Sequence, residues 1–154
     1  MTAVDRVLDE ARARLSRVDP GQAEQILRDG GWLIDIRPAA QRAAFGEVPG
    51  ALIVERNDLE WRLDPNGSHR LPGADDADRT VVVMCQEGYA SSLAAVSLLA
   101  LGRPHSTDLD GGFAAWKAAG LPTALFVAAA GILLMIPLTW QAKLRSVQGA
   151  DLER

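Results

Sequence analysis

The run "TVVVM", residues 80–84, constrains the fold more than any other segment. It consists mainly of β-branched residues without polar alternation, so a strand there would carry apolar side chains on both faces. Such a strand must be covered on both sides, which is typical of a parallel sheet between two layers of helices. Residues 91–101 follow closely, are mostly apolar and are ended by Gly102, which favours a helix. These two neighbouring segments predict an α/β fold.

The remaining segments continue this alternation of strands and helices. Further strands are predicted at 32–37 and 51–56, and a weaker strand at 105–110. Helices are predicted at 3–15, 20–27, 39–45, 57–63 and 111–120, with a loop at 64–79. The pattern predicts a mainly parallel central sheet flanked by helices. We divide the chain into an N-terminal amphipathic helix at 1–17, an α/β domain at 18–123, and an apolar C-terminal helix with a short polar tail at 124–154.

The apolar C-terminal segment is the main departure from an ordinary soluble domain. Residues 118–142 contain no charged side chain, and the core of the run is "LFVAAAGILLMIPLTW", residues 125–140. A bilayer-spanning helix needs about 20 mostly apolar residues, so this run is just long enough. Trp140 and Lys143 lie where an interfacial anchor and a flanking charge belong. We therefore predict membrane association through 124–140, with a buried or dimer-forming helix as the alternative.

Composition and charge bear on the partners, the location and the cofactors of the chain. The chain has 154 residues with 20 acidic and 16 basic side chains, and this net charge of −4 gives no support to nucleic-acid binding. A single cysteine cannot form an internal disulfide, and the charged N-terminus has no apolar signal core. We expect a cytoplasmic domain, anchored by its C-terminal helix to the inner membrane face. His69 and His105 have no partners at metal-ligand spacing, so no metal and no cofactor are predicted.

The stretch "CQEGYASS", residues 85–92, places the single cysteine between the central strand and a helix. Open α/β sheets bind ligands at the carboxyl ends of their strands, and a helix N-terminus there favours the thiolate form of cysteine. Gly88 would let successive backbone amides face the sulfur, and Ser91 and Ser92 could cap the helix. The alternative is that Cys85 only fills space as a small buried hydrophobe. The local pattern leaves both interpretations open.

Four motifs in order resemble the rhodanese-like sulfurtransferase family, over about residues 18–123. They are "LIDIR" (33–37), with Asp35 and Arg37, "GEVPGAL" (46–52), "CQEGYASS" (85–92) and "LDGGFAAW" (109–116). The resemblance implies a rhodanese-like fold and a nucleophilic Cys85. It also implies substrate binding by the loop residues Gln86, Glu87, Gly88, Tyr89, Ala90 and Ser91, with Asp35, Arg37 and Arg42 as supporting residues. Tyr89 is expected at the rim of the pocket.

The reaction implied by this resemblance is sulfur transfer in two halves. Cys85 would take a sulfane sulfur from a thiosulfate- or persulfide-type donor and form a persulfide. A thiol or cyanide acceptor would then remove that sulfur. Because the chain has no second cysteine, the acceptor must be external, either a small thiol or a protein thiol. A non-catalytic module of the same fold, which binds a partner or senses thiol chemistry through Cys85, is the alternative function.

Three positions depart from the family pattern. Many catalytic members have Arg or Thr where this chain has Ala90, and Glu87 adds a negative charge beside the thiol. Both changes should weaken capture of the thiosulfate dianion, and a like charge disfavours the thiolate. Arg37 and Arg42 could supply compensating positive charge; a structural ion pair with Asp35 or a surface role is the alternative. Glu47 replaces the family's usual His. Ser91 occupies the position where related phosphatases carry Arg, so phosphatase activity is not predicted.

Overall fold

Four parallel strands form the centre of the fold in a computed structural model that describes residues 1–125. The strand order is β2-β1-β3-β4, with every neighbouring pair parallel. The strands are β1 (Trp32–Asp35), β2 (Leu52–Ile53), β3 (Val81–Met84) and β4 (Ser106–Asp108). A parallel bridge between Val18 and Leu109 extends the β4 edge by one position. The predicted α/β class and parallel sheet are confirmed.

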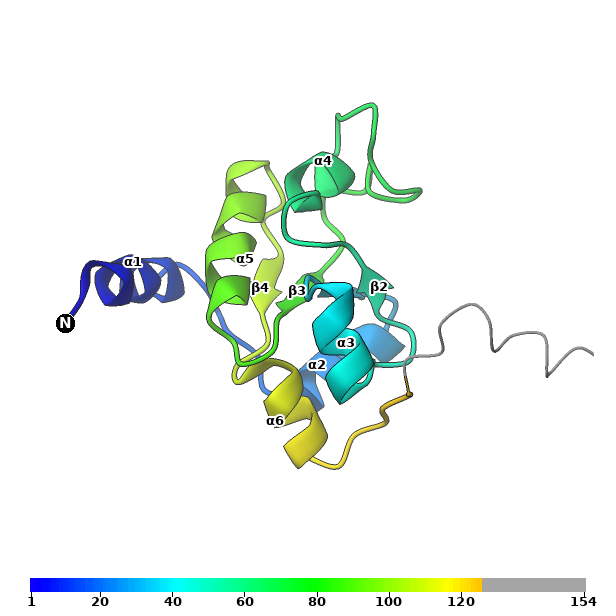
Figure 1. Ribbon diagram of the computed structural model, residues 1–154. Coiled ribbons are helices and arrows are strands. Elements are labelled where there is room, and N and C mark those ends of the chain that lie inside the picture. Colours follow the sequence, from blue (N-terminus) through cyan, green and yellow to red (C-terminus); the bar gives the residue numbers. More distant parts are fainter. Residues whose placement is uncertain (126–154) are drawn as a thin grey trace, which may run out of the picture.

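Residues 1–125 also contain six helices (Figure 1). They are α1 (Ala3–Arg12), α2 (Pro20–Arg28), α3 (Ala39–Phe45), α4 (Leu59–Leu63), α5 (Ala90–Ala100) and α6 (Gly112–Ala118). Helix α2 starts as its sequence suggests: Asp19 caps it in a reciprocal pair with Gln22, and Pro20 occupies the first turn. Each helix predicted before residue 121 is present within a few residues of its expected bounds.

The two faces of the sheet bury separate apolar clusters because strand side chains alternate. On one face, Val81 and Val83 of β3 pack with Leu98 of α5 and with α4. On the other face, Val82 and Met84 pack with Trp116 of α6 and with α2. All four residues of β3 are fully buried, as the continuous apolar run requires. The central strand thus specifies both helical layers.

Strand β3 ends at Met84 as predicted, whereas the other three strands end before their predicted limits. Strand β2 ends at Ile53 instead of residue 56, and β4 ends at Asp108 instead of residue 110. Strand β1 ends at Asp35, two residues before the predicted end at residue 37. The reason is local: the backbone N–H of Arg37 donates to Oδ1 of Asp35 at 3.0 Å instead of to a neighbouring strand. This turn leaves Asp35 and Arg37 at the carboxyl edge of the sheet, beside the end of β3.

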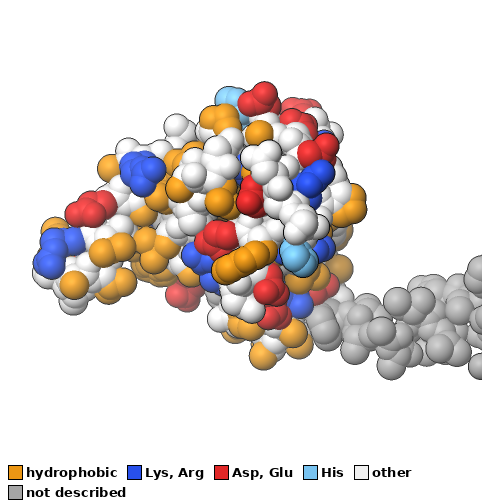
Figure 2. All heavy atoms as spheres, turned by 90° about the horizontal axis from the view of Figure 1, so that it is seen from above, with side chains coloured by type: hydrophobic (Ala, Val, Ile, Leu, Met, Phe, Trp, Pro, Cys, Tyr) orange, Lys and Arg blue, Asp and Glu red, His pale blue; other side chains and the backbone are white. Residues whose placement is uncertain are grey.

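Helix α1 projects from the body of the domain in both views (Figures 1 and 2). It contacts the domain through α5, and the side chains of Val4 and Val7 are exposed. Ala11 is the buried residue of the helix. Acidic and basic side chains are interspersed over the face of the molecule seen in Figure 2.

The described chain ends beside the loop that follows α3. Glu47 and Ala124 form an antiparallel bridge, with N···O distances of 2.8 Å in both directions. Residues 126–140 of the predicted membrane segment 124–140, and the polar tail, lie outside the described residues. Within residues 1–125, no helix has the length and apolar character needed to cross a bilayer.

Candidate active site

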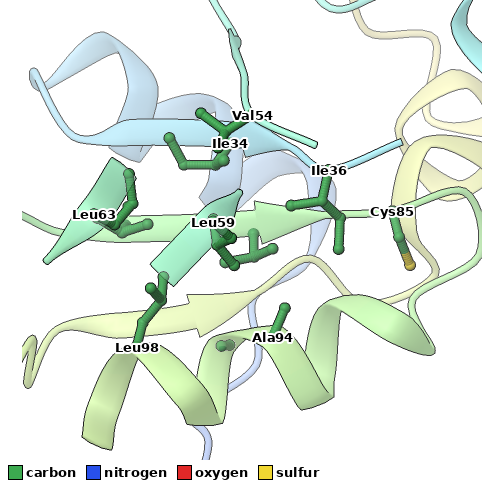
Figure 3. Packing of buried hydrophobic residues seen from close by; sticks show 11 residues of the cluster. Ile34, Ile36, Val54, Leu59, Leu63, Cys85, Ala94 and Leu98 are labelled. Carbon is green, nitrogen blue, oxygen red and sulfur yellow. The ribbon is translucent and has the colours of Figure 1, made fainter. Parts of the chain in front are cut away.

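Cys85 lies directly after the last residue of β3, at the carboxyl edge of the sheet. Continuing the alternation of Val81 and Val83, its side chain faces the layer of α5. The residue is 8% exposed, so the sulfur is largely covered by protein. Figure 3 shows Cys85 at one end of the apolar cluster, with its sulfur next to the first turn of α5. The strand period therefore decides which helix the thiol meets.

Three groups of the loop contact the sulfur of Cys85. The backbone N–H of Gly88 donates to Sγ at 3.2 Å, and the N–H of Ser91 donates at 3.4 Å. The thiol also donates to the hydroxyl of Ser91 at 3.3 Å. Gly88 has φ +81°, a conformation that glycine adopts readily and that turns its amide inward. The predicted arrangement of amides around the sulfur is present.

The carbonyls of the loop are held away from the sulfur. The carbonyl of Cys85 accepts from Phe113 N at 2.9 Å, and that of Gln86 accepts from Ala114 N at 3.0 Å. In a planar trans peptide the C=O and the following N–H point in opposite directions. Because these carbonyls are anchored on the first turn of α6, the N–H groups of Gln86 and Glu87 point toward the other side of the loop. The site can thus stabilise an anion on sulfur.

The paired glycines at 111–112 make this close approach feasible. Gly112 has φ +59°, and a Cβ on it would lie 2.5 Å from the carbonyl oxygen of Cys85. The same Cβ would lie 2.8 Å from Gln86 C and from Glu87 N. A side chain at Gly112 would displace the backbone of residues 85–91, which we call the thiol loop. The sequence motif "LDGGFAAW" therefore contains a contact surface for "CQEGYASS".

The predicted supporting residues form a buried ion-pair system next to the loop. Arg37 donates to Asp35 through a bidentate contact, with 2.7 Å between Nη2 and Oδ2, and its guanidinium also reaches Gln86 Oε1 at 3.0 Å. Arg42 pairs with Glu47 at 3.0 Å and donates to the carbonyl of Arg37. Of the alternatives for these arginines, the structure shows ion pairing and no surface role: Arg37 pairs with Asp35, as predicted, and Arg42 pairs with Glu47. Glu47, where the family usually has His, is the carboxylate partner of Arg42.

The other loop residues lie around the thiol with different exposure. Gly88 is buried, Gln86 is half-buried, and Glu87, Tyr89 and Ala90 are exposed. Tyr89 is 58% exposed, as expected for a residue at the rim, and the guanidinium of Arg12 lies 5.5 Å from its ring centroid.

The expected capping by Ser91 and Ser92 is wrong. Helix α5 begins earlier, at Ala90, with Tyr89 in the cap position, so both serines lie in its first turn. Their hydroxyls donate instead to Oδ2 of Asp108, at 3.0 Å from Ser91 and 2.8 Å from Ser92. The hydroxyls thus bind a carboxylate rather than the helix backbone.

Sequence reasoning missed three residues that lie against the loop: Arg12, Arg17 and Asp108. Arg17 donates to both carboxylate oxygens of the fully buried Asp108, at 2.9 and 3.1 Å. Burial alone would lower the pKa of Arg17, but its bonds with Asp108 and its pairing with Asp110 raise that pKa above the ordinary value. Asp108 ends strand β4 at the same edge as Cys85, which is the one signal that could have indicated it.

No group of three or more His, Cys, Asp or Glu side chains among residues 1–125 is arranged to hold a metal ion. His69 and His105 are both exposed.

Comparison with known proteins assigns this arrangement to a family. The family model described as the rhodanese-like domain matches residues 19–119. The chain belongs to the rhodanese-like domain family. Thiosulfate sulfurtransferase GlpE of Ectopseudomonas mendocina is 30% identical over 106 residues, which cover 69% of this chain and 88% of that protein. The predicted family is confirmed, and the predicted enzyme class agrees with this relative.

Solved structures support the same rhodanese-like fold. A thiosulfate sulfurtransferase from Pseudomonas aeruginosa matches with a TM-score of 0.57 and 27% identity, over 73% of this chain and 20% of that one. A protein of unknown function from Rhodopseudomonas palustris, described as a possible tyrosine phosphatase, matches with a TM-score of 0.72 and 28% identity. That match covers 80% of this chain and 95% of that one.

Proposed function

We propose that this rhodanese-like protein moves a sulfane sulfur from a small donor to an external acceptor through a persulfide on Cys85. The observation that carries the proposal is the pair of backbone amides directed at Sγ, from Gly88 at 3.2 Å and Ser91 at 3.4 Å. Amide donors stabilise an anion without adding a mobile charge. A persulfide carries its negative charge on the outer sulfur, one bond beyond Sγ. We expect the same backbone N–H groups to stabilise that charge.

The chemistry is two consecutive displacements at sulfur. In the first, the Cys85 thiolate attacks the outer sulfur of the donor, a new S–S bond forms, and the donor's own bond to that sulfur breaks. The leaving group is sulfite when the donor is thiosulfate, and an alkyl thiolate when the donor is an alkyl persulfide. In the second, a thiolate or cyanide attacks the outer sulfur of the Cys85 persulfide. The products are an acceptor persulfide or thiocyanate, and the Cys85 thiolate is regenerated.

The charges around the loop favour a persulfide donor over thiosulfate. The guanidinium groups near the loop are each bound to protein groups: Arg37 to Asp35, Arg42 to Glu47, Arg17 to Asp108, and Arg12 to the carbonyl of Gly88. Ala90 offers no charge, and the exposed Glu87 repels a dianion. An alkyl persulfide carries at most one negative charge on its sulfur, so its sulfur-capture step meets less repulsion.

The site offers less support to phosphoryl transfer. A phosphoryl oxyanion is held best by a bidentate guanidinium. Ser91 stands where related phosphatases carry that arginine, and its hydroxyl donates to Asp108. We therefore expect no hydrolysis of aryl phosphates by this chain.

The test is intact mass spectrometry after incubation with thiosulfate and, separately, with a low-molecular-weight persulfide. We expect a gain of one sulfur atom that cyanide removes and that Cys85→Ser lacks, with faster gain from the persulfide. Failure to gain sulfur from either donor would refute sulfur transfer and leave a rhodanese-like fold used for binding. Equal rates from the two donors would refute the donor preference alone.

A further inference from the structure

We propose that Arg12 and Arg17, at the N-terminus of the chain, are positioning residues that hold the thiol loop in its anion-binding shape. This inference rests on the proposed sulfur transfer and extends it to residues outside the matched family region, which begins at residue 19. We propose no contact between either guanidinium group and the substrate. Both arginines act through the carbonyl of Gly88.

The Gly88 carbonyl is the point where the two arginines meet. Arg12 Nη2 donates to it at 2.8 Å and Arg17 Nη2 at 3.1 Å, and Ser92 Oγ, whose hydrogen is directed to Asp108, lies 3.2 Å away. The amide of the same residue, Gly88, donates to Sγ of Cys85. Two cationic donors on one carbonyl oxygen form charge-assisted bonds, which are stronger than neutral ones. They fix this residue's orientation and with it the amide aimed at the sulfur.

Arg17 also neutralises the charge of Asp108. This carboxylate is fully buried and accepts from the hydroxyls of Ser91 and Ser92. Ser91 in turn contacts Sγ of Cys85, so one hydroxyl separates the carboxylate from the thiol. An unpaired negative charge at that distance would oppose a thiolate. The bidentate Arg17 contact allows Asp108 to fix both serines without adding net charge beside the sulfur.

The contacts of α1 support a role in the site rather than simple packing. Val4 and Val7 on this helix are exposed, so little apolar surface holds its first half. At its last residue, Arg12 bonds to Gly88, contacts Ser92 Oγ at 3.3 Å and lies over the ring of Tyr89. The end of α1 is therefore attached to three residues of the thiol loop and the first turn of α5. Helix α1 therefore contributes to the site although it lies outside the region matched by the family model.

The experiment compares Arg17→Lys, Arg17→Gln and Arg12→Gln with the exposed control Arg28→Gln. Arg28 pairs only with Glu24 on α2, far along the chain from the loop. Lysine keeps a positive charge for Asp108 but cannot bridge it and the Gly88 carbonyl as a guanidinium does. Arg17→Gln leaves Asp108 buried without its cation and can lose the fold, whereas Arg17→Lys and Arg12→Gln leave Asp108 paired.

Three readouts are measured on each full-length variant. Urea unfolding reports the fold, and the rate of alkylation of Cys85 by neutral iodoacetamide reports thiolate reactivity. Steady-state sulfur transfer from donor to cyanide gives kcat and KM. Because the arginines bind the loop and not the donor, we expect kcat to fall and KM to stay within about twofold. A charge-assisted bond corresponds to about 10- to 100-fold in rate, expected for Arg17→Lys. Arg12→Gln should lose about fivefold, since Arg17 remains on Gly88.

The outcomes separate this inference from the proposed function. Slower alkylation and lower kcat in folded Arg17→Lys and Arg12→Gln, with Arg28→Gln like the parent, would support positioning. Parental alkylation and kcat in those two variants would overturn it, as would a raised KM for thiosulfate at unchanged kcat, which would place the arginines on the donor. If the parent chain takes up no sulfur, the proposed function fails, and the alkylation rates still decide the positioning role.

Discussion

The contact between Gly112 and the thiol loop makes a sharp prediction for the variant Gly112→Ala. A methyl group there would lie 2.5 Å from the carbonyl oxygen of Cys85 and 2.8 Å from two further backbone atoms. Because all three are backbone atoms, no side-chain rotation can relieve the overlap. The loop must move away from α6, which breaks the bond from Phe113 N to the Cys85 carbonyl, now 2.9 Å long. The amides at Sγ move with it.

The expected cost can be separated into two parts by a matched control. Gly120 also has a positive φ, +71°, but a Cβ on it would meet nothing within 4 Å. Gly120→Ala therefore carries only the conformational cost, about 1–2 kcal/mol. Gly112→Ala carries the same cost plus the loss of one or two buried backbone hydrogen bonds, at about 1–3 kcal/mol each. We expect Gly112→Ala to be about 2–4 kcal/mol less stable than Gly120→Ala.

Urea unfolding and single-turnover sulfur uptake measure the two consequences. With a slope of about 2 kcal/mol per molar urea, the unfolding midpoint of Gly112→Ala should lie about 1–2 M below that of Gly120→Ala. Sulfur uptake should fall at least about tenfold in Gly112→Ala and remain near the parent in Gly120→Ala, because only the first displaces the amides. If the two variants have the same midpoint and the same rate, the argument that α6 shapes the loop is wrong.

Three further predictions address the ion pairs, the loop charge and the C-terminal segment. Arg37→Met should lower the free energy of unfolding by about 3–5 kcal/mol, because it leaves the buried Asp35 carboxylate unpaired. Arg56→Met, in the partly exposed pair with Glu60, should cost less than about 1 kcal/mol in the same urea experiment. Glu87→Gln should raise the rate of sulfur uptake from thiosulfate about 2- to 5-fold at low salt, with less gain at high salt and from a persulfide donor; a gain that ignores salt would contradict an electrostatic cause. We also propose that the domain lies in the cytoplasm and that residues 124–140 attach it to the inner membrane face. The full chain should then float with lipid vesicles in a density gradient, while a chain ending at Leu125, which keeps the bridge from Ala124 to Glu47, should not.

Much of the fold was readable because local patterns and tertiary packing agree. The apolar run of β3 is buried on both faces, and the helices on either side follow from that burial. Strand ends were less predictable: "WLIDIR" is apolar enough to continue, but the Asp35 side chain captures the N–H of Arg37 and ends β1. A side-chain bond to the backbone two residues away competes with the sheet, and hydrophobic periodicity carries no sign of it.

The position of the candidate site was predictable, but the partners of its charges were not. Cys85, Gly88 and Ser91 come together because they are within seven residues of one another, between a strand and a helix. An ion pair with Asp35 was among the alternatives for Arg37 and Arg42, and the structure shows it for Arg37; the pairing of Arg42 with Glu47 was not predicted. Ser91 and Ser92 were expected to cap α5, but the cap moved to Tyr89 and their hydroxyls turned to Asp108.

By itself, the sequence determined the α/β class, the strand that bears the thiol and the loop that can turn its amides toward sulfur. Each of these depends on residues close together in the chain, where the periods of strands and helices and the freedom of glycine operate. The tertiary structure alone decided that Arg12 and Arg17 meet the Gly88 carbonyl, across separations of 76 and 71 residues. Long side chains reach such partners only after the sheet and helices have packed, so no local pattern records which carbonyl or carboxylate they bind.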